Sequence, residues 1–287
     1  MAKNLNVMTV LRREQLTPHI VRLYLGGNGF DDFVPAGEPA SWDTDMYIKL
    51  AFGPDGEPYR GRDFDRKMIR LLPSREQPVL RTYTVRSIDL AAREIAVDFV
   101  VHGDEGIAGP WAARVVAGTT IHFLGPGSGY RPRGDAPWHL LAADEAGLPA
   151  VAAALEALPA DAIAKVFVEV AGPEDEIELT APPGADIVWV HRGGAAGEVA
   201  DERAGDNAPL ISAVRNADWL DGEPQVFIHG EAQAVMHNLR AYVRKERGVS
   251  AANASISGYW RRGRTEEGFR EWKSELRAAE EAAGAPA

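Results

Sequence analysis

The pattern of hydrophobic residues changes near residue 135, and this change limits the fold more than any other feature of the chain. Before it, short β-prone segments are separated by Gly, Pro and Asp, which are typical turn residues. These segments cover residues 5–10, 19–25, 46–52, 81–87, 94–101 and 119–124. Several short strands with turn signals between them predict a small antiparallel barrel or sandwich. Residues 53–80 interrupt this pattern with a polar, Pro- and Gly-rich stretch, which predicts a surface loop or a lid.

From Trp138 onward, compact apolar runs alternate with helical patterns. The runs cover residues 138–142, 165–170, 187–190 and 225–229. Apolar residues repeat at helical spacing between them, at Leu148, Val151, Leu155 and Leu158 and again at Val235, Leu239, Tyr242 and Val243. Strands that alternate with helices predict a parallel sheet. Residues 192–209 read as a mobile connection, and the chain from Thr265 reads as an exposed amphipathic helix with Phe269, Trp272 and Leu276 on one stripe.

Composition removes several kinds of chemistry. The chain has 287 residues, 45% of them hydrophobic, which is enough for two ordinary domains with packed cores. It contains no Cys, so disulfides, thiolate metal sites, cysteine-ligated iron–sulfur clusters and cysteine nucleophiles are all excluded. Its seven His residues are scattered without metal-ligand spacing, and we therefore predict no metal site.

The net charge is −11, from 31 basic and 42 acidic residues. An acidic chain repels the phosphates of nucleic acid and of anionic membranes, so neither is an expected partner. Basic residues gather at 60–75, 131–133 and 261–264, where an anionic ligand could bind. Membrane insertion is not expected, because no uninterrupted apolar stretch reaches 18 residues. The N-terminal residues lack the apolar segment of a secretory signal, and we expect a cytoplasmic protein.

The first candidate site is Arg81-Thr82-Tyr83-Thr84, which lies on a predicted strand. Side chains alternate along a strand, so Arg81 and Tyr83 share one face and the two threonines share the other. A guanidinium binds phosphate and a phenol packs against a ring system, and together they suit an anionic cofactor with an aromatic ring. The same residues would also fit an ordinary strand with an exposed Arg.

The second candidate site follows the strand that ends near Val100. Its sequence is Val100-Val101-His102-Gly103, then Gly106-Ile107-Ala108-Gly109-Pro110-Trp111-Ala112. We expect a Gly-rich turn that opens a short helix near Pro110. Backbone N–H groups at a helix start bind anions, and small residues allow a pyrophosphate to approach the main chain. An ordinary strand-to-helix turn has a similar composition.

A dinucleotide site in the second half of the chain is less clearly indicated. The chain has no GxGxxG, GxxxxGK[ST], HExxH or GxSxG motif. His229-Gly230-Glu231 ends a strand and opens a helix, a position where dinucleotides often bind. Glu231 would also suit the N-terminal end of a helix without any ligand.

Six motifs carry a resemblance to a known family. They are RTYT, DFVVHG, GIAGPWA, GPGSGY, ADEAGLPAV and SGYWRRGRTEEGFREWK. Together they resemble the siderophore-interacting proteins, which are FAD-dependent ferric-siderophore reductases related to ferredoxin–NADP reductases, over essentially the whole chain. The resemblance implies an antiparallel FAD-binding β-barrel over residues 1–134, an NAD(P)H-binding-like parallel-sheet α/β domain over 135–264 and a helical extension over 265–287.

The resemblance also implies roles for particular residues. Arg81, Thr82, Tyr83 and Thr84 would hold the FAD phosphate and isoalloxazine ring. The pyrophosphate and ribose would lie against Val100, His102, Gly106, Ala108, Gly109, Pro110, Trp111 and Ala112. Asp144 and Glu145 would contact the adenosine end of FAD, and Trp260 would lie near the flavin. Lys49, Arg261, Arg262 and Arg264 would bind an anionic ferric siderophore, although Arg261–Arg264 also suit a solvated turn and Lys49 an ordinary strand position.

Two positions depart from the family pattern. Ala146-Gly147 replaces the Thr-Ala that commonly follows the Asp-Glu pair, which puts one adenine contact in doubt. Gly127 stands where related sequences often carry Arg, and Arg131 or Arg133 are candidates to replace it.

Reduced flavin passes electrons singly, whereas a nicotinamide gives a hydride, so the expected enzyme would take electrons at FAD and pass them to Fe(III). No catalytic side chain is predicted, because electron transfer to a bound chelate needs no acid or base. The donor could be NADH, NADPH or ferredoxin. Two alternatives stay open at this point: a general flavin-dependent NAD(P)H reductase that acts on quinones or small carriers, and a siderophore-binding protein without flavin. The sequence leaves open the siderophore, the redox potential and the oligomeric state.

Overall fold

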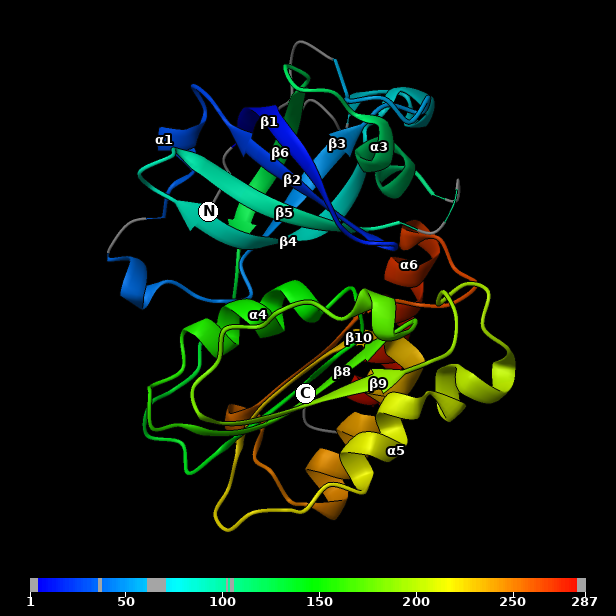
Figure 1. Ribbon diagram of the computed structural model, residues 1–287. Coiled ribbons are helices and arrows are strands. Elements are labelled where there is room, and N and C mark those ends of the chain that lie inside the picture. The colour runs from blue at the N-terminus through cyan, green and yellow to red at the C-terminus, as the bar shows by residue number, and fades with distance from the viewer. Residues whose placement is uncertain (1–4, 36–37, 61–70, 102, 104–105, 283–287) are drawn as a thin grey trace. The chain divides into compact units, whose positions relative to one another are not determined.

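The computed structural model describes the chain except for residues 1–4, 36–37, 61–70, 102, 104–105 and 283–287 (Figure 1). Two compact units make up the described chain. Residues Met1–Arg131, with Pro149–Ala157 and Ile177–Thr180, form the barrel unit, and the other residues form the sheet unit. The domain boundaries predicted from the sequence, at 134 and 264, stay predictions.

The barrel unit contains a closed antiparallel barrel, as the sequence predicts (Figure 1). Its strands are β1 (Leu5–Thr17), β2 (Ile20–Gly26), β3 (Tyr47–Phe52), β4 (Val79–Asp89), β5 (Glu94–Val100) and β6 (Thr120–Gly127). They follow the order β1-β2-β5-β4-β3-β6 around the barrel. Helices α1 (Phe30–Phe33) and α3 (Ala108–Arg114), most of α4 (Leu148–Glu156) and short 3₁₀ turns at Pro39–Ser41 and Ser74–Glu76 also belong to this unit.

Alternate residues of the strands fill the barrel, since β2 buries Leu23 and Leu25 and β3 buries Ile48 and Leu50. Trp111 of α3 closes part of this core and is 1% exposed. Its ring centroid lies 5.3 Å from that of Phe52 and 5.8 Å from that of Phe99. These edge-to-face contacts fix α3 against strands β3 and β5.

Strand β4 leaves its neighbour β5 halfway along its length. Residues Val85–Asp89 pair with β5, whereas the segment Val79–Thr84 is paired with β3. All of β5 pairs with β2, but among the described residues its last part, from Asp98 to Val100, pairs with no residue of β4. The barrel therefore opens locally between the RTYT segment of β4 and the end of β5.

The sheet unit is built on a five-stranded parallel sheet. Its strands are β7 (His139–Ala143), β8 (Ile163–Val170), β9 (Gly184–His191), β10 (Gln225–Glu231) and β11 (Ala254–Trp260), in the order β11-β10-β7-β8-β9. Helices α5 (Pro209–Arg215) and α6 (Glu266–Ala282) belong to this unit, as do π-helical segments at Gln233–Leu239 and Tyr242–Glu246. Helix α4 (Leu148–Glu156) follows β7. Strands β8 and β9 lie on one side of β7, and β10 and β11 lie on its other side. The direction in which strands are added to the sheet therefore reverses between β7 and β10.

Three sequence expectations about the sheet unit need correction. Strand β11 was missed, because Ser255, Ser257 and Gly258 weaken the apolar signal of this edge strand. Helix α6 is present, but it was expected to be an exposed helix, whereas Phe269 of its apolar stripe is 4% exposed and stacks on Trp272. Residues 192–209 were expected to be a mobile connection, yet several of them pack into the unit, namely Arg192, Ala195, Ala196, Val199 and Ala208.

No helix in the described part of the chain is long and apolar enough to span a membrane. Among the same residues, no group of three or more His, Cys, Asp or Glu side chains could hold a metal ion.

Candidate functional site

The RTYT segment lies where β4 parts from β5. Arg81 is directly opposite Leu50 and Tyr83 is opposite Ile48, while Thr82 is opposite Lys49. Residues directly opposite each other project to the same face, so Arg81 and Tyr83 share one face, as the alternation predicts. Thr82 is exposed on the other face, beside Lys49.

Aromatic contacts connect RTYT to the second motif. The ring of Tyr83 lies 4.3 Å from that of Phe99 in β5, and Phe99 lies 5.8 Å from Trp111 in α3. The three rings fix the spacing between the strand with Arg81 and the helix that begins at Ala108. Two segments that are separate in the sequence thereby become neighbours.

The start of α3 is shaped by two glycines. Gly106 has φ +80°, and a Cβ built there would meet no atom within 4 Å, so the turn borders open space. A Cβ on Gly109 would lie 2.9 Å from the Val100 carbonyl oxygen, so only Gly lets the helix approach β5 this closely. The first helical bond runs from the Trp111 N–H to the Ile107 carbonyl, which leaves the amides of Ala108 and Gly109 ahead of the ladder. His102, predicted to act here, lies outside the described residues.

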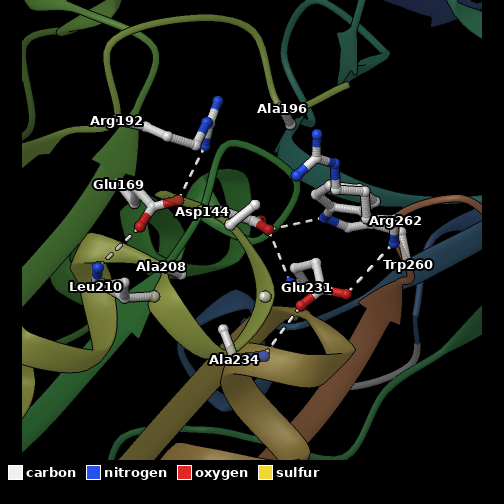
Figure 2. Close-up of a pocket in the computed structure, with 12 residues that line it drawn as sticks. Asp144, Glu169, Arg192, Ala196, Ala208, Leu210, Glu231, Ala234, Trp260 and Arg262 are labelled. Atoms are coloured by element: carbon white, nitrogen blue, oxygen red, sulfur yellow. Dashed lines mark hydrogen bonds and ion pairs between the residues drawn. The ribbon is translucent and has the colours of Figure 1, made fainter. Parts of the chain in front are cut away.

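In the sheet unit, charged residues from four strand ends form a second group, the strand-end cluster, at the carboxyl edge of the sheet (Figure 2). It consists of Asp144 and Glu145 after β7, Glu169 in β8, Arg192 after β9 and Glu231 in β10, with Trp260 at the end of β11. Parallel strands end at the same edge of a sheet, and this edge is where ligands of open α/β folds bind.

Asp144 joins the ends of three strands. Its Oδ2 accepts a hydrogen bond from the Trp260 indole N–H at 2.7 Å and one from the Glu231 backbone N–H at 2.8 Å. Its Oδ1 accepts the Ala146 backbone N–H at 2.9 Å and the Gly147 N–H at 3.3 Å. The carboxylate therefore holds β7, β10 and β11 in register at their ends and fixes the indole of Trp260 (Figure 2).

Burial and the neighbouring Glu145 raise the pKa of Asp144 to about 7, against the opposing effect of the Trp260 hydrogen bond. In the unfolded chain, an Asp releases its proton near pH 4. Native Asp144 therefore keeps a proton between pH 4 and 7 that the unfolded chain has lost, so its contribution to stability falls as pH rises through this window.

The Asp144→Asn variant tests this pH dependence. The measured quantity is the free energy of unfolding of the wild type minus that of the variant, in which Asn does not titrate. This difference should fall from pH 4 to pH 7 and stay constant above pH 7. Denaturant unfolding followed by circular dichroism at several pH values measures it. Asp135→Asn, which changes a side chain that is 84% exposed, serves as the control and should leave the profile unchanged. A wild-type-to-variant difference that is flat from pH 4 to 7 would show that Asp144 is ionised throughout.

Arg192 lies between two buried carboxylates. It donates to Glu145 Oε2 at 3.1 Å and to Glu169 Oε1 at 3.0 Å, and it pairs with the second oxygen of Glu145 as well. Glu169 also accepts the Leu210 backbone N–H at the start of α5 at 2.8 Å. Burial acts to lower the pKa of Arg192, but Glu145 and Glu169 outweigh it and the guanidinium stays charged.

Glu231 connects the cluster to the basic segment that follows β11. Its Oε2 accepts the Ala234 N–H at 3.0 Å, as a helix cap does, and its Oε1 accepts the Arg262 N–H at 3.3 Å. The Arg262 guanidinium pairs with Asp201 at 3.0 Å. The space among Asp144, Glu169, Glu231 and Trp260 is about 20 Å³, which is room for about one water molecule.

The predicted site residues thus fall into separate groups. RTYT, Val100 and the α3 turn come together in the barrel unit, and Asp144, Glu145 and Trp260 come together in the sheet unit. Both carboxylates there bind the chain itself, and their contacts with adenosine stay predictions.

The basic residues predicted to bind substrate are held in different ways. Arg261 donates to Gln233 at 2.6 Å and lies 4.6 Å from the Trp272 ring, while Arg264 is exposed. Lys49 lies on β3 of the barrel unit, 5.9 Å from the Tyr47 ring. Of the two arginines considered as replacements at position 127, Arg131 binds the Trp42 carbonyl and Arg133 donates to Asn253 at 2.8 Å.

Sequence reasoning missed Glu169 and Arg192. Like Asp144 and Glu231, each is a charged residue at or just after the end of an apolar run. Four such residues at the ends of parallel strands must meet at one edge of the sheet, so this repeated position was the available signal.

The barrel-unit site fits FAD by its own geometry. Where β4 parts from β5, Arg81 and Tyr83 share one face of the strand and supply a guanidinium and a phenol, which suit a phosphate and a flat ring. The α3 turn adds open space at Gly106, the close approach at Gly109 and two amides ahead of the helical ladder. These are donors for a pyrophosphate.

Comparisons with known proteins agree with this geometry. Residues 9–130 match the family described as "Siderophore-interacting FAD-binding domain", and residues 136–263 match "Siderophore-interacting protein". Together the two matches cover most of the chain.

Individual relatives point the same way. An uncharacterized protein of Mycobacterium tuberculosis is 57% identical over 281 residues, which are 96% of this chain and 97% of the relative. The ferric vibriobactin reductase ViuB of Vibrio cholerae is 27% identical over 92% of each chain. The crystal structure of a siderophore utilization protein from T. fusca has a TM-score of 0.74 and 35% identity over 92% of this chain and 95% of its own. The chain therefore belongs to the siderophore-interacting protein family and carries that family's FAD-binding domain.

Proposed function

We propose that this protein is an FAD-dependent ferric-siderophore reductase, which passes electrons from NADH, NADPH or ferredoxin to Fe(III) held in a siderophore. The observation that carries the proposal is the contact of Tyr83 with Phe99 and of Phe99 with Trp111, which places the Arg81–Thr84 segment beside the helix that begins at Ala108. The similarity to a ferric vibriobactin reductase supports the choice of substrate. A cytoplasmic address is part of the same proposal.

In the barrel unit, Arg81 would bind an FAD phosphate through its guanidinium, and Tyr83 and Thr84 would orient the isoalloxazine ring. The amides of Ala108 and Gly109 would donate to the pyrophosphate. Bound FAD supplies the exchange between a two-electron donor and one-electron transfer to iron. The aromatic contacts of Tyr83, Phe99 and Trp111 hold these groups in place, so the protein contributes positioning and electrostatics.

Lys49 in the barrel unit and the exposed part of the Arg261–Arg264 turn in the sheet unit are each candidates for binding an anionic ferric siderophore. Arg264 is exposed, and Gly263, with φ +72°, shapes the turn that presents it. Arg262 would support this turn through Asp201 and Glu231. Reduction to Fe(II) weakens a hard-oxygen chelate and releases the metal, and it requires no proton transfer by a side chain.

The expected dinucleotide position at His229-Gly230-Glu231 is occupied by the chain's own contacts. A Cβ on Gly230 would lie 2.8 Å from the Asp144 carboxyl carbon, and Glu231 caps the following helix. Burial lowers the pKa of His229 to about 3, so this imidazole is neutral and supplies no positive charge for a phosphate. The donor is therefore left to experiment.

The test is an anaerobic absorbance experiment on the purified full-length protein, reconstituted with FAD where needed. NADH, NADPH and reduced ferredoxin are added separately, followed by a ferric siderophore and a ferrous trap. Bleaching of the flavin bands by one donor, with recovery and trapped Fe(II) on adding the chelate, is the expected result and names the donor. A protein that takes up no FAD would instead be a siderophore-binding protein, and flavin that reoxidises with quinones but not with ferric chelates would indicate a general flavin reductase.

Lys49→Gln tests the substrate role of the barrel unit. Loss of one positive charge should raise KM for an anionic ferric chelate several-fold and leave quinone reduction unchanged. Lys245→Gln removes an exposed charge from the sheet unit and is the matched control. An equal effect of Lys49→Gln on both substrates would remove Lys49 from the chelate site.

A further inference from the structure

Tyr47 and Gly127 form an unusual pair on the face of the barrel that carries Lys49. Tyr47 begins β3 and is directly opposite Gly127 of β6. A Cβ on Gly127 would lie 2.6 Å from both Cζ and the hydroxyl oxygen of Tyr47. The ring therefore lies across the main chain of β6, in the space that any other residue at position 127 would fill.

The neighbours of Tyr47 on this face are polar and cationic. Lys49 projects to the same face two residues along β3, and its Nζ lies 5.9 Å from the centre of the Tyr47 ring. Across the ladder, Thr84 is opposite Tyr47 and the exposed Thr82 is opposite Lys49. Tyr47 itself is only partly buried. An aromatic ring, an ammonium group and a hydroxyl thus lie together at the surface of three strands.

This combination suits a particular kind of anion. A catecholate or phenolate ligand presents a flat aryl ring together with negatively charged oxygens that bind iron. The ring can stack on a phenol, and the oxygens can meet an ammonium group. A hydroxamate ligand has negative oxygens but no aryl face, so it could use only the lysine.

We propose that Tyr47 determines the specificity of the ferric-siderophore site and selects chelates whose iron ligands are aryl oxygens, that is catecholates or phenolates. This inference rests on the proposed function. Lys49 supplies charge attraction to ferric chelates in general, and Tyr47 supplies the discrimination between aryl and aliphatic ligands. Gly127 is required because its missing side chain leaves the space that the hydroxyl end of the Tyr47 ring occupies.

The test measures binding to the FAD-loaded protein by fluorescence quenching, with two probes. One is the ferric tris-catecholate complex of 2,3-dihydroxybenzoic acid, and the other is the ferric tris-hydroxamate complex of desferrioxamine B. Each variant is compared with the wild type for the same probe, so that the different charges of the two complexes cancel. We expect Tyr47→Leu to weaken tris-catecholate binding about three- to tenfold and tris-hydroxamate binding less than twofold. Tyr47→Phe, which keeps the ring, should bind both probes as the wild type does.

Two further variants make the result decisive. Gly127→Ala leaves Tyr47 in the chain but displaces its ring, and it should cause the same selective loss even where Tyr47→Leu fails to fold. Tyr24→Leu removes another partly buried tyrosine of the barrel, whose ring centre lies 3.4 Å from Cζ of Arg12. It should change the affinity for neither probe. Flavin absorbance and melting temperature confirm that each variant keeps its cofactor and fold.

The outcomes separate this inference from the proposed function. Wild-type protein that binds both probes, with equal or no loss in Tyr47→Leu and Gly127→Ala, overturns the role of Tyr47 and leaves the reductase intact. Wild-type protein that binds neither probe and yields no Fe(II) overturns the proposed function and the inference with it.

Discussion

Replacing Arg192 with Met should lower the free energy of unfolding by about 3–5 kcal/mol, because it leaves two buried carboxylates without their counter-charge. Arg192 is 3% exposed, and its partners Glu145 and Glu169 are 3% and 5% exposed. Water cannot replace the guanidinium at these depths. Glu169 also binds the first turn of α5 through Leu210, so the loss should spread to that helix.

Equilibrium unfolding in urea, followed by circular dichroism, measures this effect. Arg215→Met is the matched control: Arg215 forms a similar two-point pair with Glu246, but the two side chains are 41% and 53% exposed. An exposed pair contributes about 1 kcal/mol or less. Adding Glu145→Gln and Glu169→Gln to Arg192→Met should restore part of the stability, because the uncompensated charges are then removed. Similar losses for Arg192→Met and Arg215→Met would contradict the buried ion cluster.

Replacing Arg81 with Ala should weaken FAD binding about tenfold to a hundredfold, since a hydrogen bond to a charged group contributes about 1.5–3 kcal/mol. The fold should survive, because Arg81 is only partly buried and its guanidinium donates to the carbonyl of the adjacent Leu80 at 3.1 Å. Flavin content after gel filtration and the dissociation constant from fluorescence titration give the two readouts.

Two companion variants sharpen the Arg81 experiment. Arg81→Lys keeps the charge but loses the planar fork, so it should bind FAD with intermediate affinity. Arg75→Ala removes an arginine of the barrel unit whose side chain is 86% exposed, and it should leave FAD binding unchanged. Full flavin occupancy in Arg81→Ala would remove this residue from the cofactor site.

The sequence predicted the elements that have strong local signals. Alternating β-prone segments between turn residues predicted all six barrel strands, and four apolar runs predicted β7 to β10. RTYT and the α3 turn were identified as two candidate sites because residue type and spacing are local properties of the chain, and the family resemblance assigned both of them to FAD. Strand β11 was missed because it lies at the edge of the sheet, where Ser255 and Ser257 need not be apolar.

Local sequence could not decide how distant charges combine. The adenosine contact of Asp144 stays a prediction, whereas its hydrogen bonds from Trp260 and from the backbone of Glu231 could be seen only in the structure. These contacts join residues that are 87 and 116 positions apart, and they follow from the order of strands in the sheet. The same holds for α6, because its sequence allowed the apolar stripe to pack on its own chain or on a partner, and only the structure shows Phe269 buried within its own chain.

By itself, then, the sequence determined the antiparallel barrel, the parallel sheet and the segments of the cofactor site. Each of these is encoded within a few neighbouring positions, by the hydrophobic period, by turn residues, or by the RTYT and Gly-rich segments. Tertiary structure alone decided the parting of β4 from β5, the pairing of Arg192 with two glutamates, and the placement of the Tyr47 ring over Gly127. These features depend on strand order and register, which bring together residues that no local pattern connects.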